Sequence, residues 1–441
     1  MKRLLSSLPL PVFPIFLIFL ISPSPLSLAL VGPHPHSLLL LGSQTRSSQR
    51  PQALLPHLSL SSPSLAALGV AAQERGPQAV SEQELQAAID RLGNLDFPVR
   101  MNASRTIRRA PATQAVPALI QAAANHADGY VRFRALVLLS GFKDPRTPDI
   151  VRSLLNDPNA RLREVAYAWY EHNPDPRILS QLLQLLEREQ DEFLRPALVR
   201  ALAALGEDSR VRDTLLLDVR RGQDFFRSAV IESLGEYRAA YAVQPILEVA
   251  LLDGPLQDDA VLALGRIGDH RALETLAGLQ RSAARENQPV IAAAICLLGV
   301  NCVAHERYLA DTLRFAVQNP GYQALLRGAV TAIAALASRG NPDALRLLLD
   351  VAIPSENPAR APLALAVATV AIRNTPLLLT TLEPYTGREG AIALLGEGFD
   401  MLEEDYDEES FFVTVRHAYW QAADGSPART VAEALVQKLE F

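Results

Sequence analysis

The chain has 441 residues, with 42 Lys and Arg against 48 Asp and Glu, which gives a formal net charge of −6. Hydrophobic residues make up 49% and aromatic residues 6%, a composition that excludes collagen-like and strongly disordered chains. Two cysteines exclude a disulfide framework and a zinc-cluster fold, and the lack of a basic block removes the electrostatic footprint of a DNA- or RNA-binding protein.

Residues 1–72 differ in composition from the rest. They contain four basic residues and no Asp or Glu, and 11 of the 31 prolines precede residue 80. A basic start, apolar stretches and the small-residue site Val70-Ala71-Ala72 are typical of an export signal. We therefore predict cleavage near Ala72, a linker over 73–81, and a mature protein in the periplasm or outside the cell.

Two other interpretations of this leader stay open. The apolar run 12–31 is long enough to span a membrane, but Pro14, Pro23 and Pro25 make it a poor transmembrane helix. The two alternatives to a cleaved export signal are a Pro/Ser-rich leader that stays attached and an uncleaved leader that anchors the protein to a membrane.

From residue 82 to 385 the sequence repeats one unit. A small or aliphatic position, the repeat column, recurs every 30 to 36 residues, and a second apolar position follows four residues later. Residues with this spacing share one face of a helix, so each unit is predicted to begin with an amphipathic helix. The column holds Ala103, Ala135, Ala166, Leu198, Val230, Ala260, Ala294, Val330 and Leu363, and the second position holds Ile107, Leu139, Tyr170, Leu202, Leu234, Leu264, Leu298, Ala334 and Val367.

Seven of the nine units have an arginine three residues before the column. An acid three or four residues earlier, at the predicted helix start, would cap free N–H groups and pair with this arginine. An acidic residue of the neighbouring unit is the alternative partner. We interpret these arginines as structural and not as a ligand-binding ladder: Arg100, Arg132, Arg163, Arg195, Arg227, Arg327 and Arg360.

Each unit continues with a turn and a second amphipathic helix. Gly235, Gly265 and Gly299 follow a leucine of the second apolar position and are expected to supply left-handed helix caps. The predicted fold class is therefore all-α, an α-solenoid of about nine helix-turn-helix repeats over 82–385 with a C-terminal helical cap over 386–441. Because such units pack only on their neighbours, we expect a curved rod with an extended concave face.

The segment 259–273, DAVLALGRIGDHRAL, resembles the short HEAT-like repeats of phycobilisome lyase-type proteins, although Gln257 replaces the usual arginine. The resemblance covers about residues 82–385. It implies a HEAT-like solenoid in which the second helix of each unit lines the concave face, and it specifies architecture rather than activity.

Two enzymatic alternatives come from related repeat proteins. Deoxyhypusine hydroxylase holds di-iron with several His-Glu dipeptides, whereas this chain has one, His305-Glu306, which we interpret as a helix start. A bilin lyase would need a pigment pocket. Tyr167, Trp169 and Tyr170 could stack on a flat ligand, but we expect them to fill space between units.

Two further features need an interpretation. Cys296 and Cys302 are six residues apart and could form a disulfide in an oxidising compartment, with two unpaired thiols as the alternative.

Residues 403–409 contain six acids, without the ligand spacing and glycine of an EF-hand loop. We expect a solvated, mobile acidic loop, with attraction of a basic partner segment or loose calcium binding as alternatives.

The sequence thus predicts a non-catalytic scaffold or adaptor that binds a protein or peptide partner along the concave face. We predict no catalytic, cofactor-binding or metal-ligating residues, no cofactor and no nucleic-acid partner. An enzyme of the same repeat class, bilin lyase-like or a metal-dependent oxidoreductase, is the alternative.

Overall fold

A computed structural model describes residues 78–402, 405–439 and 441, which lie in one compact unit, Ala71–Phe441. The predicted leader 1–72 and most of the predicted linker lie outside the described residues. Twenty-two α-helices and no strand run through the described ranges. The predicted all-α solenoid class is therefore confirmed.

The described chain begins with a short helix, α2 (Glu82–Arg91), and nine repeat units follow it. All nine residues of the repeat column are buried, and the second position is buried in every unit except the eighth, where Ala334 is half-buried. The first helices of the units are α3 (Phe97–Arg109), α5 (Gly129–Gly141), α7 (Ala160–His172), α9 (Arg195–Ala203), α11 (Asp224–Glu236), α13 (Gln257–Ile267), α15 (Gln288–Leu297), α17 (Gln323–Ser338) and α19 (Arg360–Arg373).

The second helices complete these units, in three cases after a short 3-10 turn: η2 (Pro176–Ile178), η3 (Ala240–Ala242) and η4 (His270–Ala272). They are α4 (Ala112–Asn125), α6 (Thr147–Leu154), α8 (Leu179–Arg188), α10 (Ser209–Asp218), α12 (Val243–Ala250), α14 (Leu273–Ser282), α16 (Cys302–Gln318), α18 (Pro342–Ala352) and α20 (Thr375–Leu382). Three more helices follow: α21 (Arg388–Phe399), α22 (Asp405–Gln421) and α23 (Pro427–Lys438).

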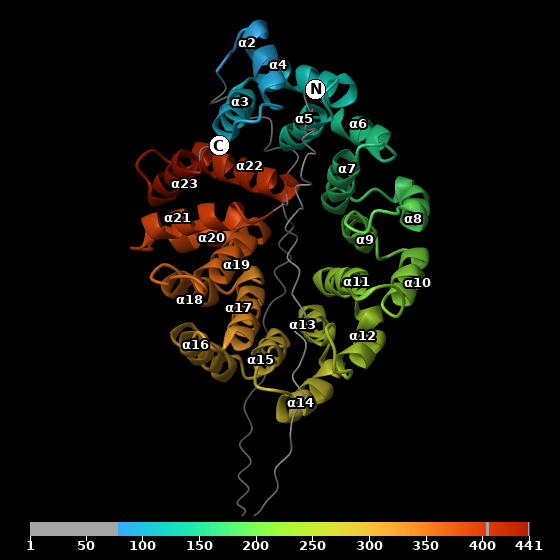
Figure 1. Ribbon diagram of the computed structural model, residues 1–441, viewed down its shortest axis with the longest axis vertical. Helices are drawn as coiled ribbons and strands as arrows, with labels where there is room; N and C mark the ends of the chain where they lie inside the picture. Colours follow the sequence, from blue (N-terminus) through green and yellow to red (C-terminus); the bar gives the residue numbers. More distant parts are fainter. Residues whose placement is uncertain (1–77, 403–404, 440) are drawn as a thin grey trace, which may run out of the picture. The chain divides into compact units, whose positions relative to one another are not determined.

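The first helices, not the second, form the inner layer of the curve (Figure 1). From α7 onward they pack closely on one another from unit to unit, whereas the outer second helices have few contacts with one another. The expectation that second helices line the concave face is therefore wrong. The tighter packing belongs to the inner layer because that layer has the shorter arc.

Glycines let inner helices approach one another at backbone distance. A Cβ on Gly235 would lie 2.7 Å from the Cα of Ala263, and one on Gly265 would lie 2.7 Å from the Cα of Ala294. Both glycines lie inside helices, so their predicted role as left-handed caps is wrong. Gly268 caps α13 with φ 79°, and Gly299 has the expected left-handed backbone with φ 80°.

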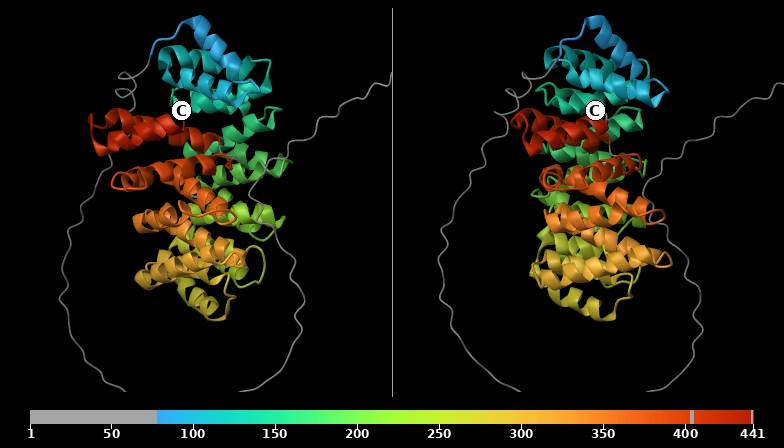
Figure 2. Two further views of the ribbon diagram at one scale, coloured as in Figure 1. Left: turned by 60° about the vertical axis from the view of Figure 1, so that its left-hand side comes forward. Right: turned by 90° about the vertical axis from the view of Figure 1, so that its left-hand side faces the viewer.

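The curve closes on itself. Helix α22 packs against α5 and α7 near the start of the array, as well as against α19, α20 and α23 beside it. The two views of Figure 2 agree: the red C-terminal helices lie beside the blue-green N-terminal ones. The predicted curved rod is therefore replaced by a ring, and we call the contact between α22 and helices α3, α5 and α7 the seam.

Within the described ranges, no single helix combines the length and apolar composition needed to cross a membrane. Only the bent pair α19 and α20, with 111° between the two helices, reaches these limits together.

The close approach of inner helices predicts opposite effects for two Gly→Ala changes. Gly265→Ala should lower the free energy of unfolding by about 1 to 3 kcal/mol, because the new methyl group forces α13 away from α15. The control Gly278→Ala lies in outer helix α14, where the nearest atom to a new Cβ is 3.9 Å away. It should stabilise by about 0.5 to 1 kcal/mol through helix propensity. Urea unfolding measures both, and equal shifts would contradict the packing argument.

Candidate functional site

Five of the seven repeat arginines cap the helix or turn that precedes their own helix. Their guanidinium groups donate to carbonyl oxygens that the preceding helix end leaves without intrahelical partners. Gln257 replaces arginine and donates to the carbonyl of Ala250 at 3.1 Å. The other bonds run from Arg100 to Asn94 and Leu95, from Arg132 to Ala123, from Arg163 to Asp157, from Arg227 to Val219, and from Arg360 to Ala352, Ile353 and Ser355.

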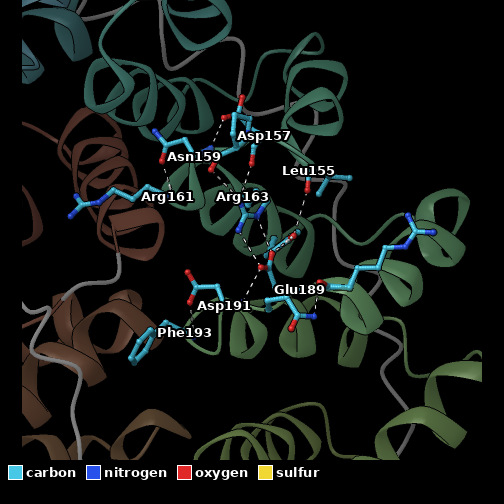
Figure 3. Close-up of polar contacts among 12 residues, drawn as sticks. Leu155, Asp157, Asn159, Arg161, Arg163, Glu189, Asp191 and Phe193 are labelled. Atoms are coloured by element: carbon cyan, nitrogen blue, oxygen red, sulfur yellow. Dashed lines mark hydrogen bonds and ion pairs between the residues drawn. The ribbon is translucent and has the colours of Figure 1, made fainter.

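Arg163 shows how this cap joins two units (Figure 3). Its Nε and Nη2 donate to the Glu189 carboxylate at 2.9 and 3.1 Å, and the Tyr167 hydroxyl donates to the same carboxylate at 3.1 Å. Burial tends to raise the pKa of Glu189, but the hydrogen bonds from Arg163 and the Asp191 N–H outweigh it and lower that pKa. Burial and the charge of Glu189 raise the pKa of Tyr167. This buried network is structural and holds no exposed reactive group.

The arginines draw on both of the expected kinds of acidic partner. Arg227 pairs with Asp224 in its own first turn at 3.2 Å. Three others pair with a residue of a neighbouring helix or loop: Arg132 with Asp157 at 2.5 Å, Arg163 with Glu189, and Arg360 with Glu397 at 2.7 Å. Arg195 lies 4.2 Å from the ring centroid of Phe226, and Arg327 is exposed.

The histidine and cysteine candidates share the start of α16. His305 and Glu306 follow Cys302 by three and four residues in this helix, and Glu306 accepts a hydrogen bond from Asn341 Nδ2 at 2.6 Å. Among the described residues, no group of three or more His, Cys, Asp or Glu is placed to hold a metal ion. Cys296 and Cys302 are joined by a disulfide, with Cα atoms 4.5 Å apart, across the turn between α15 and α16.

A row of side chains follows the starts of four inner helices; Arg161, Phe193 and Phe225 are exposed and Tyr130 is half-buried. Tyr130, Arg161, Phe193 and Phe225 each stand five residues before the repeat column, in units two to five. The Arg161 guanidinium lies 5.6 Å from the Tyr130 ring centroid, and the Phe193 and Phe225 rings are 6.1 Å apart. We call these four residues the rim row. Figure 3 shows Arg161 and Phe193 pointing to the same side of the array, away from Glu189.

The rim row extends at one end to the first unit. The Arg100 guanidinium lies 5.9 Å from the Tyr130 ring and 5.6 Å from the ring of Phe97, which is 58% exposed. Phe193 and Phe225 are each 41% exposed. This row was not predicted, although its signal is present in the sequence five residues before the repeat column.

The expectation that the acidic run 403–409 forms a solvated, mobile loop is wrong for its described residues. Its described residues, Asp405 to Glu409, form the first turns of α22 and lie in the seam instead of a solvated loop. Arg108 of α3 donates through Nε and Nη2 to the Glu409 carboxylate at 2.9 and 2.5 Å, and the two side chains are only 1% and 2% exposed. These partners are 301 residues apart, so local spacing gave no sign of them.

Two further ion pairs extend the seam along α5 and α7. Arg134 of α5 pairs with Asp405, and His172 Nε2 of α7 lies 3.2 Å from Asp407. The other ring nitrogen of His172 lies 3.0 Å from the Ala168 carbonyl, so both nitrogens can donate only in the imidazolium form. Burial tends to lower the pKa of His172, but Asp407 outweighs it and raises that pKa to about 9.

The seam is not fully satisfied. Arg108 Nη1 and Arg416 Nη1 are buried without a hydrogen-bond partner. Burial, followed by the charge of Asp405, raises the pKa of Glu408 to about 7, and burial lowers the pKa of Arg416 to about 10. A small cavity of about 40 Å³ also remains where α22 begins, lined in part by Phe133, Arg200 and Asp407. The seam therefore holds charges that a better-matched ligand could satisfy more fully.

The raised pKa of His172 predicts how stability depends on pH. The imidazolium contribution is complete below pH 6.5 and is lost as pH rises through about 9. Glu408 acts in the same direction at lower pH, between its ordinary pKa of 4.5 and about 7. The free energy of unfolding should fall by about 1 kcal/mol between pH 7 and 9, a value reduced because the imidazole is partly exposed. Urea unfolding should show this slope in the wild type and a much smaller one, from Glu408, in His172→Gln. Equal slopes would refute the assignment.

Comparisons with known proteins agree on the repeat. Residues 85–171 match the HEAT repeat family, and residues 256–282 match the PBS lyase HEAT-like repeat. No curated protein matches the chain.

Three solved structures have low similarity to this chain. One is the CpcE and CpcF complex of phycocyanin lyase from Nostoc sp. PCC7120, at 17% identity, covering 59% of this chain and 97% of that one, with a TM-score of 0.37. Importin beta follows at 14% identity, with 85% and 57% covered and a TM-score of 0.32. The karyopherin Kap121p bound to the SUMO protease Ulp1p has 13% identity, 82% and 46% coverage and a TM-score of 0.28. Over residues 85–171 the chain is similar to HEAT repeats and over residues 256–282 to the PBS lyase HEAT-like repeat, in line with the resemblance seen in its sequence.

Proposed function

We propose that this protein is a non-catalytic scaffold that holds a protein or peptide partner on the inner layer of its HEAT-like array, along the rim row. The observation that carries the proposal is that one position of four consecutive units holds the half-buried Tyr130 and the exposed Arg161, Phe193 and Phe225. The buried repeat column makes the packing between units, and the exposed side chains lie beside it. Exposed aromatic side chains in a contiguous arrangement are typical of interaction surfaces.

The composition of the rim row suits a partner that combines apolar side chains with carboxylates. Phe193 and Phe225 form an edge-to-face pair with interplanar angle 63°, which presents a rigid apolar surface. Arg161 lies over the rings of Tyr130 and Phe133 at 5.6 and 5.4 Å, which leaves its N–H groups available for an acidic group of the partner. Tyr, Phe and Arg anchors of this kind dominate binding energy at protein interfaces.

Site-specific photocrosslinking in cells tests the proposal. A benzophenone amino acid in place of Phe225 should give a discrete crosslinked partner. The same group in place of Val303, which is 83% exposed at the start of outer helix α16, should not. With the partner purified, Phe193→Ala should weaken binding by roughly 30-fold, or about 2 kcal/mol, whereas Val303→Ala should leave it unchanged. A partner that crosslinks only through position 303 would overturn the proposal.

We propose further that the protein acts after export, with cleavage near Ala72 as the composition of its leader indicates. The Cys296–Cys302 disulfide supports an oxidising compartment, because such bonds persist there and are rare in the cytosol. Intact-mass analysis of protein taken from cells should give a chain that begins near Gln73 and takes up alkylating reagent only after reduction. A full-length cytosolic chain with two alkylated cysteines would contradict export.

A further inference from the structure

The seam differs in chemistry from the interfaces between repeats. Neighbouring inner helices meet through buried Ala, Leu, Val and Ile side chains. Across the seam, by contrast, the first turns of α22 contact the array through three ion pairs with α3, α5 and α7. An interface held by charged groups resembles a reversible protein–protein contact more than a folded core.

The array side of the seam is built to receive an acidic helix. Arg108, Arg134 and His172 come from three consecutive first helices and each faces a carboxylate of α22. At the end of α5, a Cβ on Gly141 would lie 2.9 Å from both Glu409 Oε1 and Val413 Cγ2, so the glycine permits the close approach of α22. We call Arg108, Arg134, Gly141 and His172 the socket.

The occupant of the socket has a definite pattern. Its acids are Asp405, Asp407 and Glu409, and the ring of Phe412 lies 5.0 Å from the Arg108 guanidinium. The pattern is therefore Asp-x-Asp-x-Glu-x-x-Phe on a helix. The fit is incomplete, because Arg108 Nη1 has no hydrogen-bond partner. A foreign helix with one more acceptor near Arg108 would satisfy this nitrogen.

We propose that the socket is a binding site for an acidic, phenylalanine-containing helix of a partner protein, and that α22 occupies it as an intramolecular competitor. A partner helix of this pattern displaces α22, so that its binding opens the ring at the seam. Because α22 is tethered to the same chain, its high effective concentration keeps the site closed until such a helix is present. The inference rests on the proposed scaffold function only in requiring a protein partner.

A peptide with the sequence of residues 405–421, labelled with a fluorophore, tests the socket in the full chain. Fluorescence anisotropy should show weak binding to the wild type. Binding should be at least tenfold tighter to the triple variant Asp405→Asn, Asp407→Asn, Glu409→Gln, in which α22 competes poorly. Adding Arg108→Met and Arg134→Met to this variant should abolish binding. A matched peptide with its acids replaced by Asn and Gln should not bind.

Hydrogen exchange on the wild type gives a second measurement that does not depend on how the variants fold. Saturating peptide should increase exchange in α22 and leave the outer helices α12 and α14 unchanged. Peptide binding without loss of protection in α22 would overturn the inference, as would equal affinity of the wild type and the triple variant. These results concern the socket alone. Loss of crosslinking at Phe225 would instead count against the rim row.

Discussion

Close approach between first helices is the constraint on which the rest of the structure depends. Where Gly265 meets Ala294, backbones touch without an intervening side chain, and the same holds where Gly235 meets Ala263. The outer helices pack on the inner layer but have few contacts with one another. A stack that is narrow inside and wide outside must bend, and nine units of consistent bend bring the two ends of this array together.

Closure of the ring changes how the stability of the array depends on contacts between its units. In an open solenoid each unit touches only its neighbours, and stability is close to a sum of local terms. Here the Arg108–Glu409 pair joins residues at opposite ends of the array, so the end units are held from both sides. Because the pair is buried, removing one partner alone leaves an uncompensated charge and should cost several kcal/mol, about 3 to 5 by analogy with other buried pairs. The seam therefore joins specific residues. Because it is held by charges and contains nitrogens without hydrogen-bond partners, it is the interface at which a partner helix could most readily replace α22.

Most of the fold could be predicted from the spacing of apolar residues within each unit. The column from Ala103 to Leu363 identified nine first helices because helical burial repeats every three or four residues, a signal contained within each unit. Closure of the ring could not be predicted in this way. The acids at 405–409 lie far along the chain from their partners Arg108, Arg134 and His172, and no repeated spacing connects them. The roles of Gly235 and Gly265 were missed for a similar reason: a helix cap is a local event, whereas a close approach depends on the neighbouring helix. The rim row could have been found, because it recurs in register with the column.

A distance measurement between the two ends tests closure most directly. Spin labels at Asn102 on α3 and Ser410 on α22, both exposed, can be placed in a Cys296→Ala, Cys302→Ala background. The closed ring predicts one short separation, roughly 15 to 25 Å from helix rise and side-chain reach. An open array of nine stacked units would instead place the labels roughly 80 Å apart or more, and a distribution centred there would contradict the account.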